Sequence, residues 1–381
     1  MTKKKESPRS TKHALLAVGA FVVAAGAAFV FAYGALPQLM SVSYSQIVAT
    51  STAPKLPPPP PPLDKTAYDQ KLLALAHVAT SSAWYIAFQA GTTTITLPGA
   101  TTTIKVAPKA WPTRQPYPED GRALLPFNRI VAYYGNFYAT GMGVLGQYPP
   151  DEMLPRLQAA AAQWAAADPA TPVIPAIDYI AVVAQGSAGA DGKYRARMPD
   201  SQIDEALSLA DKVNGIVVLD VQVGLSDLQT EIPLLEKYLK LPNVHLAIDP
   251  EFAMHNGTPP GRVIGSLDAS DVNYTAQYLA SLVKEYNLPP KILVVHRFTE
   301  DMVTNVDKIE PNPQVQIVMD MDGWGGQAKK IGTYTYVVAA EPVQFTGFKL
   351  FYKNDTLAST TMLTPAQVLD LTPSPVFIQY Q

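Results

Sequence analysis

The sequence predicts an α/β fold, a (β/α)8 TIM-barrel-like domain, because apolar strand-like runs alternate with amphipathic helical runs from residue 127 onward. Eight strand-like runs occupy about 255 residues, and both the number and the length are typical of an eight-stranded parallel barrel. The acidic side chains also gather at the late ends of these runs, where barrel enzymes carry their functional groups. A doubly wound open sheet built from the same units is the alternative.

The strand-like runs are short, apolar and bounded by turn residues. In order they are 129–135, 172–182, 215–223, 244–252, 291–298, 315–322, 347–353 and 376–381. The clearest helical runs between them are 151–168, 201–213, 228–239, 271–287 and 364–371.

The N-terminal part of the chain lies outside this pattern. Residues 1–13 carry five basic side chains and one acidic one, and residues 14–36 form an uncharged apolar run. A run of that length crosses a hydrocarbon core of ~30 Å, and the basic flank favours the cytoplasmic side. We therefore predict a cytoplasmic tail, a single-pass membrane anchor and an extracytoplasmic remainder. A cleaved signal peptide is the alternative, since AYGA offers small residues near a cleavage point.

A linker is expected between the anchor and the barrel, over residues 37–126. Pro57 to Pro62 favour extended polyproline II structure, and a threonine-rich stretch follows later. A short amphipathic helix is expected near 64–78. The compact barrel domain is expected to cover 127–381.

Composition excludes several classes of function. The chain of 381 residues has no cysteine, which excludes disulfides, thiolate metal sites and a cysteine nucleophile. The formal net charge is −3 although the first residues are basic, so the remainder is acidic. An acidic domain argues against a nucleic-acid partner.

Four consecutive strand-like runs change from apolar to polar residues on one face near their carboxyl ends. Alternate residues of a strand share a face, so these side chains are expected to surround one pocket at the top of the barrel. They are Asp220 and Gln222, Asp249 and Glu251, His296, and Asp320 and Asp322. Taken singly, an aspartate there is often a helix cap, and a histidine is often structural.

Paired carboxylates with nearby aromatic side chains indicate glycoside hydrolysis. Glu251 is the expected general acid, because flanking Phe252 and the crowded acids should raise its pKa. Asp249 and Asp320 are candidates for the second carboxylate, and His296 is included among the catalytic candidates. The expected substrate-binding residues are Asp220, Gln222, Asp322, Trp324, Tyr134 and Arg297.

The segment IDPEF, residues 248–252, resembles the Asp-x-Glu pair at a barrel strand end in lysozyme-type muramidases of glycoside hydrolase family 25. The resemblance implies that Glu251 is the proton donor and that Asp249 stabilises the reacting sugar. The chain differs from that family in having Pro250 between the acids. The segments VAYYGN, DVQVG, DPEF and VVHRFT also resemble a family of exported bacterial TIM-barrel proteins, which implies the fold and the domain boundary but no particular activity.

Two further interpretations remain open. The same acids and His296 are hard ligands suited to a divalent cation, although no HExxH motif is present, and we expect neither a metal nor a cofactor. The expected partner is a polysaccharide or peptidoglycan. The competing function is a non-catalytic barrel that binds carbohydrate or a cell-wall partner.

Overall fold

The computed structural model describes residues 58–78, 94–96, 103–105, 111–113, 115–358 and 361–381. The basic tail and the membrane anchor predicted at 14–36 lie outside the described residues. Within those ranges no helix combines the length and apolar character needed to cross a membrane.

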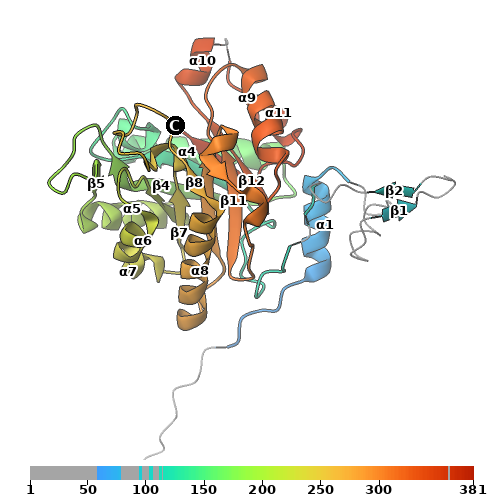
Figure 1. Ribbon diagram of the computed structural model, residues 1–381. Helices are drawn as coiled ribbons and strands as arrows, with labels where there is room; N and C mark the ends of the chain where they lie inside the picture. The colour runs from blue at the N-terminus through green and yellow to red at the C-terminus, as the bar shows by residue number, and fades with distance from the viewer. Residues whose placement is uncertain (1–57, 79–93, 97–102, 106–110, 114, 359–360) are drawn as a thin grey trace, which may run out of the picture. The chain divides into compact units, whose positions relative to one another are not determined.

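Eight parallel strands close into a barrel, which confirms the predicted fold class (Figure 1). Neighbouring strands follow the order β3-β13-β12-β11-β9-β7-β6-β4, and β4 pairs with β3 to complete the circle. The strands are β3 Arg129–Gly135, β4 Val173–Ala184, β6 Ile216–Val221, β7 Val244–Ile248, β9 Lys291–Arg297, β11 Val315–Met321, β12 Phe345–Leu350 and β13 Phe377–Tyr380. Each coincides with one predicted run to within a few residues at either end.

In the part of the chain that the structure describes, five short strands lie outside the barrel. β5, Arg195–Arg197, extends β4 as an antiparallel hairpin. β8, Leu267–Asp268, pairs in parallel with β10, Val303–Thr304. β1, Thr94–Thr96, pairs antiparallel with β2, Thr103–Lys105.

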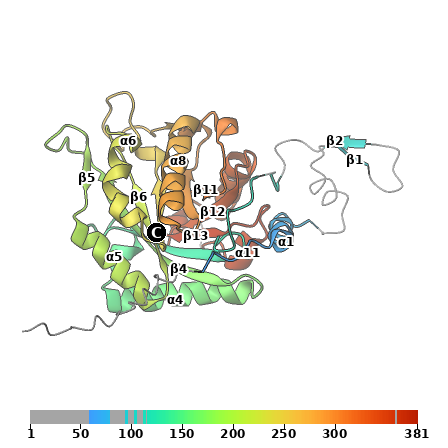
Figure 2. The ribbon, with the colours of Figure 1, turned by 90° about the horizontal axis from the view of Figure 1, so that it is seen from below.

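Helices surround the strands, as the view from below shows (Figure 2). The α-helices are α1 Lys65–Leu75, α3 Val144–Gln147, α4 Pro150–Ala167, α5 Asp200–Lys212, α6 Leu228–Glu231, α7 Glu236–Leu239, α8 Ala269–Tyr286, α9 Gln327–Thr333, α10 Asn354–Ala358 and α11 Pro365–Leu369. The 3-10 turns are Ile232–Leu235, Pro250–Phe252, Glu300–Met302 and Val306–Lys308, and a π-helical segment spans Tyr334–Ala339. The helix predicted at 228–239 is divided by the first of these turns, because Pro233 has no backbone N–H to continue an α-helix.

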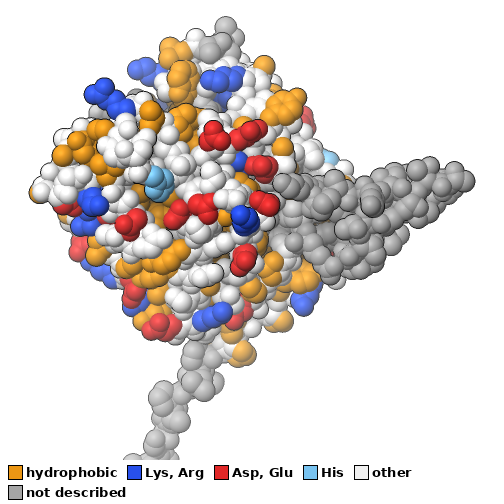
Figure 3. Space-filling view, in the orientation of Figure 1, with side chains coloured by type: hydrophobic (Ala, Val, Ile, Leu, Met, Phe, Trp, Pro, Cys, Tyr) orange, Lys and Arg blue, Asp and Glu red, His pale blue; other side chains and the backbone are white. Residues whose placement is uncertain are grey.

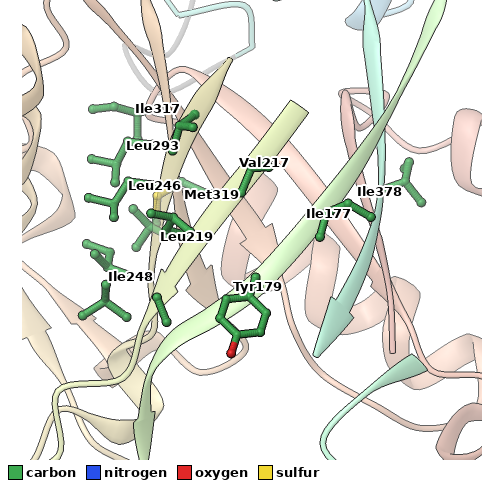
Figure 4. Packing of buried hydrophobic residues seen from close by; sticks show 14 of the residues in the cluster. Ile177, Tyr179, Val217, Leu219, Leu246, Ile248, Leu293, Ile317, Met319 and Ile378 are labelled. Atoms are coloured by element: carbon green, nitrogen blue, oxygen red, sulfur yellow. The ribbon is translucent and has the colours of Figure 1, made fainter. Parts of the chain in front are cut away.

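The outward side chains of the strands pack beneath these helices and form the larger hydrophobic core. Figure 4 shows part of it, with labelled side chains from β4, β6, β7, β9, β11 and β13. Burial on both faces explains why the strands read as nearly continuous apolar runs.

The inward side chains of the strands are small or apolar in the lower half of the barrel and form a second core. Its strand residues are Ile130, Ala132, Ala176, Ile216, Val218, Ala247, Ile292, Val294, Val318, Phe345 and Phe377. Tyr68, Leu72 and Leu75 of α1 belong to the same cluster. The backbone N–H of Ser374, just before β13, donates to the carbonyl of Leu75 at 2.7 Å. Helix α1 therefore packs at the end of the barrel where the strands begin.

The compact unit consequently starts at Pro58 and not at residue 127. The predicted helix near 64–78 exists, but it belongs to the barrel rather than to a free linker. The prolines at the start of the unit are also held, since Gly121 N–H donates to the Pro61 carbonyl at 2.7 Å.

The surface mixes side chains of all kinds. Figure 3 shows acidic, basic and hydrophobic side chains interspersed over one face.

Candidate active site

Seven barrel strands, and the first residue after the eighth, β7, each bring a polar side chain into the barrel directly above the inner apolar core. Each polar residue lies two positions beyond an inward apolar residue or glycine, so the change occurs at the same level of every strand. The eight are Tyr134, Asp178, Asp220, Asp249, His296, Asp320, Lys349 and Gln379, and none is more than 4% exposed. Charges buried this deeply need partners, because an unpaired buried charge is costly.

His296 lies among three carboxylates. Its Nε2 is 2.9 Å from Asp220 Oδ2, and its Nδ1 is 3.4 Å from Asp320 Oδ2 and 3.3 Å from Asp322 Oδ2. Burial lowers the pKa of His296, but Asp220 and the two other acids outweigh burial and raise it well above its ordinary value. The ring is therefore an imidazolium at neutral pH.

Gly347 makes room for one of these acids. A Cβ at this position would lie 2.3 Å from Asp320 Oδ1, and Asp320 is fully buried beside β12. We expect Gly347→Ala to lower the free energy of unfolding by about 1–3 kcal/mol, as overpacking does. Gly332→Ala in α9 is the control, because open space surrounds that position and alanine favours a helix. Urea unfolding measures both, and equal stability of the two variants would contradict the steric reading.

Lys349 on β12 forms the second cationic centre. Its Nζ lies 2.8 Å from Asp322 Oδ1 and 3.8 Å from the centroid of the Tyr134 ring. Burial lowers the pKa of Lys349, but the nearby Asp322 outweighs burial, so that the pKa of Lys349 is raised above its ordinary value. Burial also raises the pKa of Asp322, but Lys349 and His296 together bring it down to about 2. Asp322 is thus held as a carboxylate between two cations.

Asp249 and Glu251 reach the site through a turn and not through a strand. Strand β7 ends at Ile248, and Asp249 caps a 3-10 turn by accepting a hydrogen bond from the Glu251 N–H at 3.1 Å. Gln222 Nε2 donates to Asp249 Oδ2 at 3.2 Å. Burial raises the pKa of Asp249 well above its ordinary value. Burial and the nearby Asp322 raise the pKa of Glu251 to about 7.

A cavity of about 620 Å³ opens above the polar layer. The acids at its wall are Asp249, Glu251 and Asp322, and the predicted residues Tyr134, Gln222 and Trp324 line it as well. Lys329 and Lys349 supply the basic groups. The cavity therefore combines carboxyl groups, cations and aromatic rings, which is the composition of a small-molecule or sugar site.

Four predicted site residues do not line this cavity. Asp220, His296 and Asp320 are fully buried beneath it, where they contact one another. Arg297 points out of the barrel, because it alternates with His296 along β9. Its guanidinium donates to the Glu300 carbonyl at 2.8 Å and lies 2.6 Å from Glu341. The expectation that Arg297 contacts substrate is therefore not met.

The candidate site residues predicted from the sequence do not include three members of the polar layer, namely Asp178, Lys349 and Gln379. Gln379 Nε2 donates to Asp178 Oδ2 at 2.6 Å, and burial and Asp220 raise the pKa of Asp178 to about 8. Each residue lies within a strongly apolar strand, where a lone polar residue is easily read as an exposed one. The sequence signal that could identify each of these polar residues is its position, two residues after an inward-facing residue of the same strand.

The acids do not assemble into a metal site in the part of the chain that the structure describes. Within it, no group of three or more histidine and acidic side chains has an arrangement able to hold a metal ion. The positively charged groups in contact with these acids are the imidazole ring of His296 and the ammonium group of Lys349.

No protein-family model matches the chain, and no curated protein matches it in sequence. Among solved structures, the chain matches a GH5-4 broad specificity endoglucanase from an uncultured bovine rumen ciliate. The match has 10% sequence identity and a TM-score of 0.29, and it covers 54% of this chain and 72% of that chain. Similarity this low does not bear on activity, so both fold and site rest on the geometry described above.

Proposed function

We propose that this protein is a glycoside hydrolase that acts on cell-envelope or extracellular glycan, with Glu251 as the general acid. The observation that carries the proposal is a pair of carboxyl groups in one cavity with widely separated pKa values. Glu251, at about 7, keeps its proton in mildly acidic solution, whereas Asp322, at about 2, is ionised. A proton donor and a carboxylate held by different environments are what acid–base cleavage of a glycosidic bond requires.

In this mechanism Glu251 protonates the oxygen of the leaving sugar as its bond to the other ring breaks, and Asp322 faces the positive charge that develops on that ring. A water molecule then adds to the same ring carbon and gives up a proton, which restores the protonated form of Glu251. Asp322 takes the place of Asp249 and Asp320 as the second carboxylate, because burial raises the pKa values of those two acids. Asp249 is a positioning residue, since it accepts the N–H of Glu251 and so orients the donor. Trp324, 51% exposed, offers an aromatic face to a sugar ring.

The layer beneath the cavity supports this division of roles. His296 and Lys349 both contact Asp322, and their positive charge favours its ionised form. We therefore propose that His296, Asp220 and Asp320 act through Asp322 rather than on substrate.

The first test is Glu251→Gln in the full chain, assayed by release of reducing ends from peptidoglycan and a panel of polysaccharides. Loss of a general acid typically lowers the rate by about 10²–10⁴-fold, and we expect a loss in this range. Glu285→Gln is the matched control, because Glu285 is exposed on α8 and does not line the cavity. Full activity of Glu251→Gln would remove Glu251 from the mechanism.

The pH dependence gives an independent check. Because Glu251 acts in its protonated form and its pKa is about 7, the rate should fall as pH rises through 7. Below that value the rate should stay level until Asp322 takes up a proton near pH 2. A rate that rises through pH 7 would assign Glu251 the role of a base.

A non-catalytic carbohydrate-binding barrel is the second candidate, and one observation favours it. The Asp322 carboxylate is already occupied by Lys349 at 2.8 Å and by His296 at 3.3 Å, which reduces its availability for chemistry. Under this alternative, parent and Glu251→Gln release no reducing ends, and both bind the same glycan with equal affinity.

We also propose the cellular setting that the sequence predicts, a single-pass anchor at 14–36 with the barrel outside the membrane. The uncharged run and its basic flank support it. Protease treatment of intact cells tests it, since an extracytoplasmic barrel is cleaved or released without lysis.

A further inference from the structure

The loop after β11 holds Trp324 at the rim of the cavity. It has the sequence GWGG, residues 323–326, and Trp324 is 51% exposed although it is the largest hydrophobic side chain. Leaving so much apolar surface in water forfeits burial energy. A tryptophan retained in that position on a rigid support is suited to stacking against a ligand.

The support is a buried ion pair beneath the loop. Lys330 Nζ lies 2.9 Å from Asp355 Oδ2, and both residues are about 1% exposed. Lys330 also donates to the carbonyl of Gly323 at 2.9 Å, while the N–H of Gly325 donates to Asp355 Oδ1 at 3.0 Å. The backbone on both sides of Trp324 is thus tied to the barrel, which sets where along the rim its ring is presented.

Lys329 is an exposed residue whose ammonium lies over the face of this ring. Its Nζ lies 5.3 Å from the centroid of Trp324, and the side chain lines the cavity. Gly325 allows this approach, because a Cβ there would meet Lys329 Cδ at 2.9 Å. Among the described residues, no carboxylate forms a salt bridge with Lys329, whereas Lys330 and Lys349 each have one.

The remaining charges of the cavity leave Lys329 uncompensated. Lys349 pairs with Asp322, and burial raises the pKa values of Asp249 and Glu251 so that both favour the neutral form in mildly acidic solution. The rim therefore presents an exposed aromatic ring and, over it, a positive charge that forms no salt bridge among the described residues.

We infer that Trp324 and Lys329 form a subsite for an acidic sugar, so that the glycan recognised here carries carboxylate groups on its rings. This inference rests on the proposed function for the identity of the ligand as a glycan. The sugar ring stacks on Trp324, and its carboxylate pairs with Lys329.

The test is a binding measurement that does not require hydrolysis. The full chain is titrated by calorimetry with an oligomer of uronic acid and with the carboxyl-reduced, neutral oligomer of the same length and linkage. An exposed ion pair changes an equilibrium constant by at most about fivefold, so we expect the acidic oligomer to bind about three- to fivefold more tightly. High salt should reduce the preference, because it screens exposed charges.

Three variants assign the effect to residues. Lys329→Gln should bind the acidic and the neutral oligomer equally, with the affinity that the parent has for the neutral oligomer. Lys329→Arg should keep the preference for the acidic oligomer. Trp324→Ala should weaken the binding of both oligomers by the same factor. The subsite is refuted if the parent binds the two oligomers equally or binds neither of them. It is also refuted if Lys329→Gln keeps the full preference for the acidic oligomer. Hydrolysis by the parent with none of this preference would leave Glu251 in place and refute only the acidic specificity.

Discussion

His296→Gln is expected to lower the free energy of unfolding by about 3–5 kcal/mol at neutral pH, because removing one partner of a buried ion cluster leaves the others uncompensated. Asp220 and Asp322 contact the ring at 2.9 and 3.3 Å, and both carboxylates are buried. Urea unfolding at several pH values measures the effect.

The pH dependence has a definite sign. Because the folded-state pKa of His296 is raised above 6.5, its stabilisation is complete below 6.5 and is lost as pH rises through the folded-state pKa. In His296→Gln, the neighbouring carboxyl groups take up protons as the pH falls, which removes part of their uncompensated negative charge. The difference in stability between the variant and the parent should therefore become smaller in acid.

His245→Gln is the matched control. His245 is also buried on the inward face of a barrel strand, but its Nδ1 accepts the N–H of Ile292 and burial lowers its pKa well below 6.5. It is therefore neutral, and glutamine offers a replacement acceptor. Equal losses for the two variants would show that the charge of His296 contributes nothing.

Removing the segment before residue 127 is expected to prevent folding of the barrel. Tyr68, Leu72 and Leu75 bury their side chains in the inner core, and at about 1.5–3 kcal/mol each they contribute roughly 5–9 kcal/mol. That is comparable with the whole stability of an ordinary domain, about 5–15 kcal/mol. A chain beginning at Pro58 keeps every one of these contacts and should retain the stability of the full chain.

Circular dichroism and proteolysis of the two truncated chains decide between the boundaries. A point substitution refines the comparison: Leu72→Ala should cost about 2–5 kcal/mol, whereas exposed Gln70→Ala in the same helix should change stability by less than about 0.5 kcal/mol. If a chain that begins at residue 127 is stable and unfolds cooperatively, α1 belongs to the linker and not to the barrel.

The barrel was predictable because its signal is local and repeated. Strands buried on both faces require apolar runs, and parallel pairing requires a crossover between them, so eight runs with helices between them leave few arrangements. The polar ends of β6, β9 and β11 and the acids after β7 were predictable for the same reason, since alternate residues share a face. Asp249 and Glu251 were placed at the right end of the right strand, although a turn rather than a strand brings them there.

Contacts between segments distant in the sequence required the folded chain. Nothing near Lys349 in the sequence indicates that it lies 2.8 Å from Asp322, or that Arg297 turns outward to Glu341. The role of α1 is of the same kind, because a short helix beside a run of prolines reads as part of a linker until its apolar face meets the open end of the barrel. The amino-acid pattern thus determined the barrel and the level at which its interior becomes polar. The three-dimensional packing decided which acids are ionised, because a pKa depends on burial and on charges that the chain brings together from different strands.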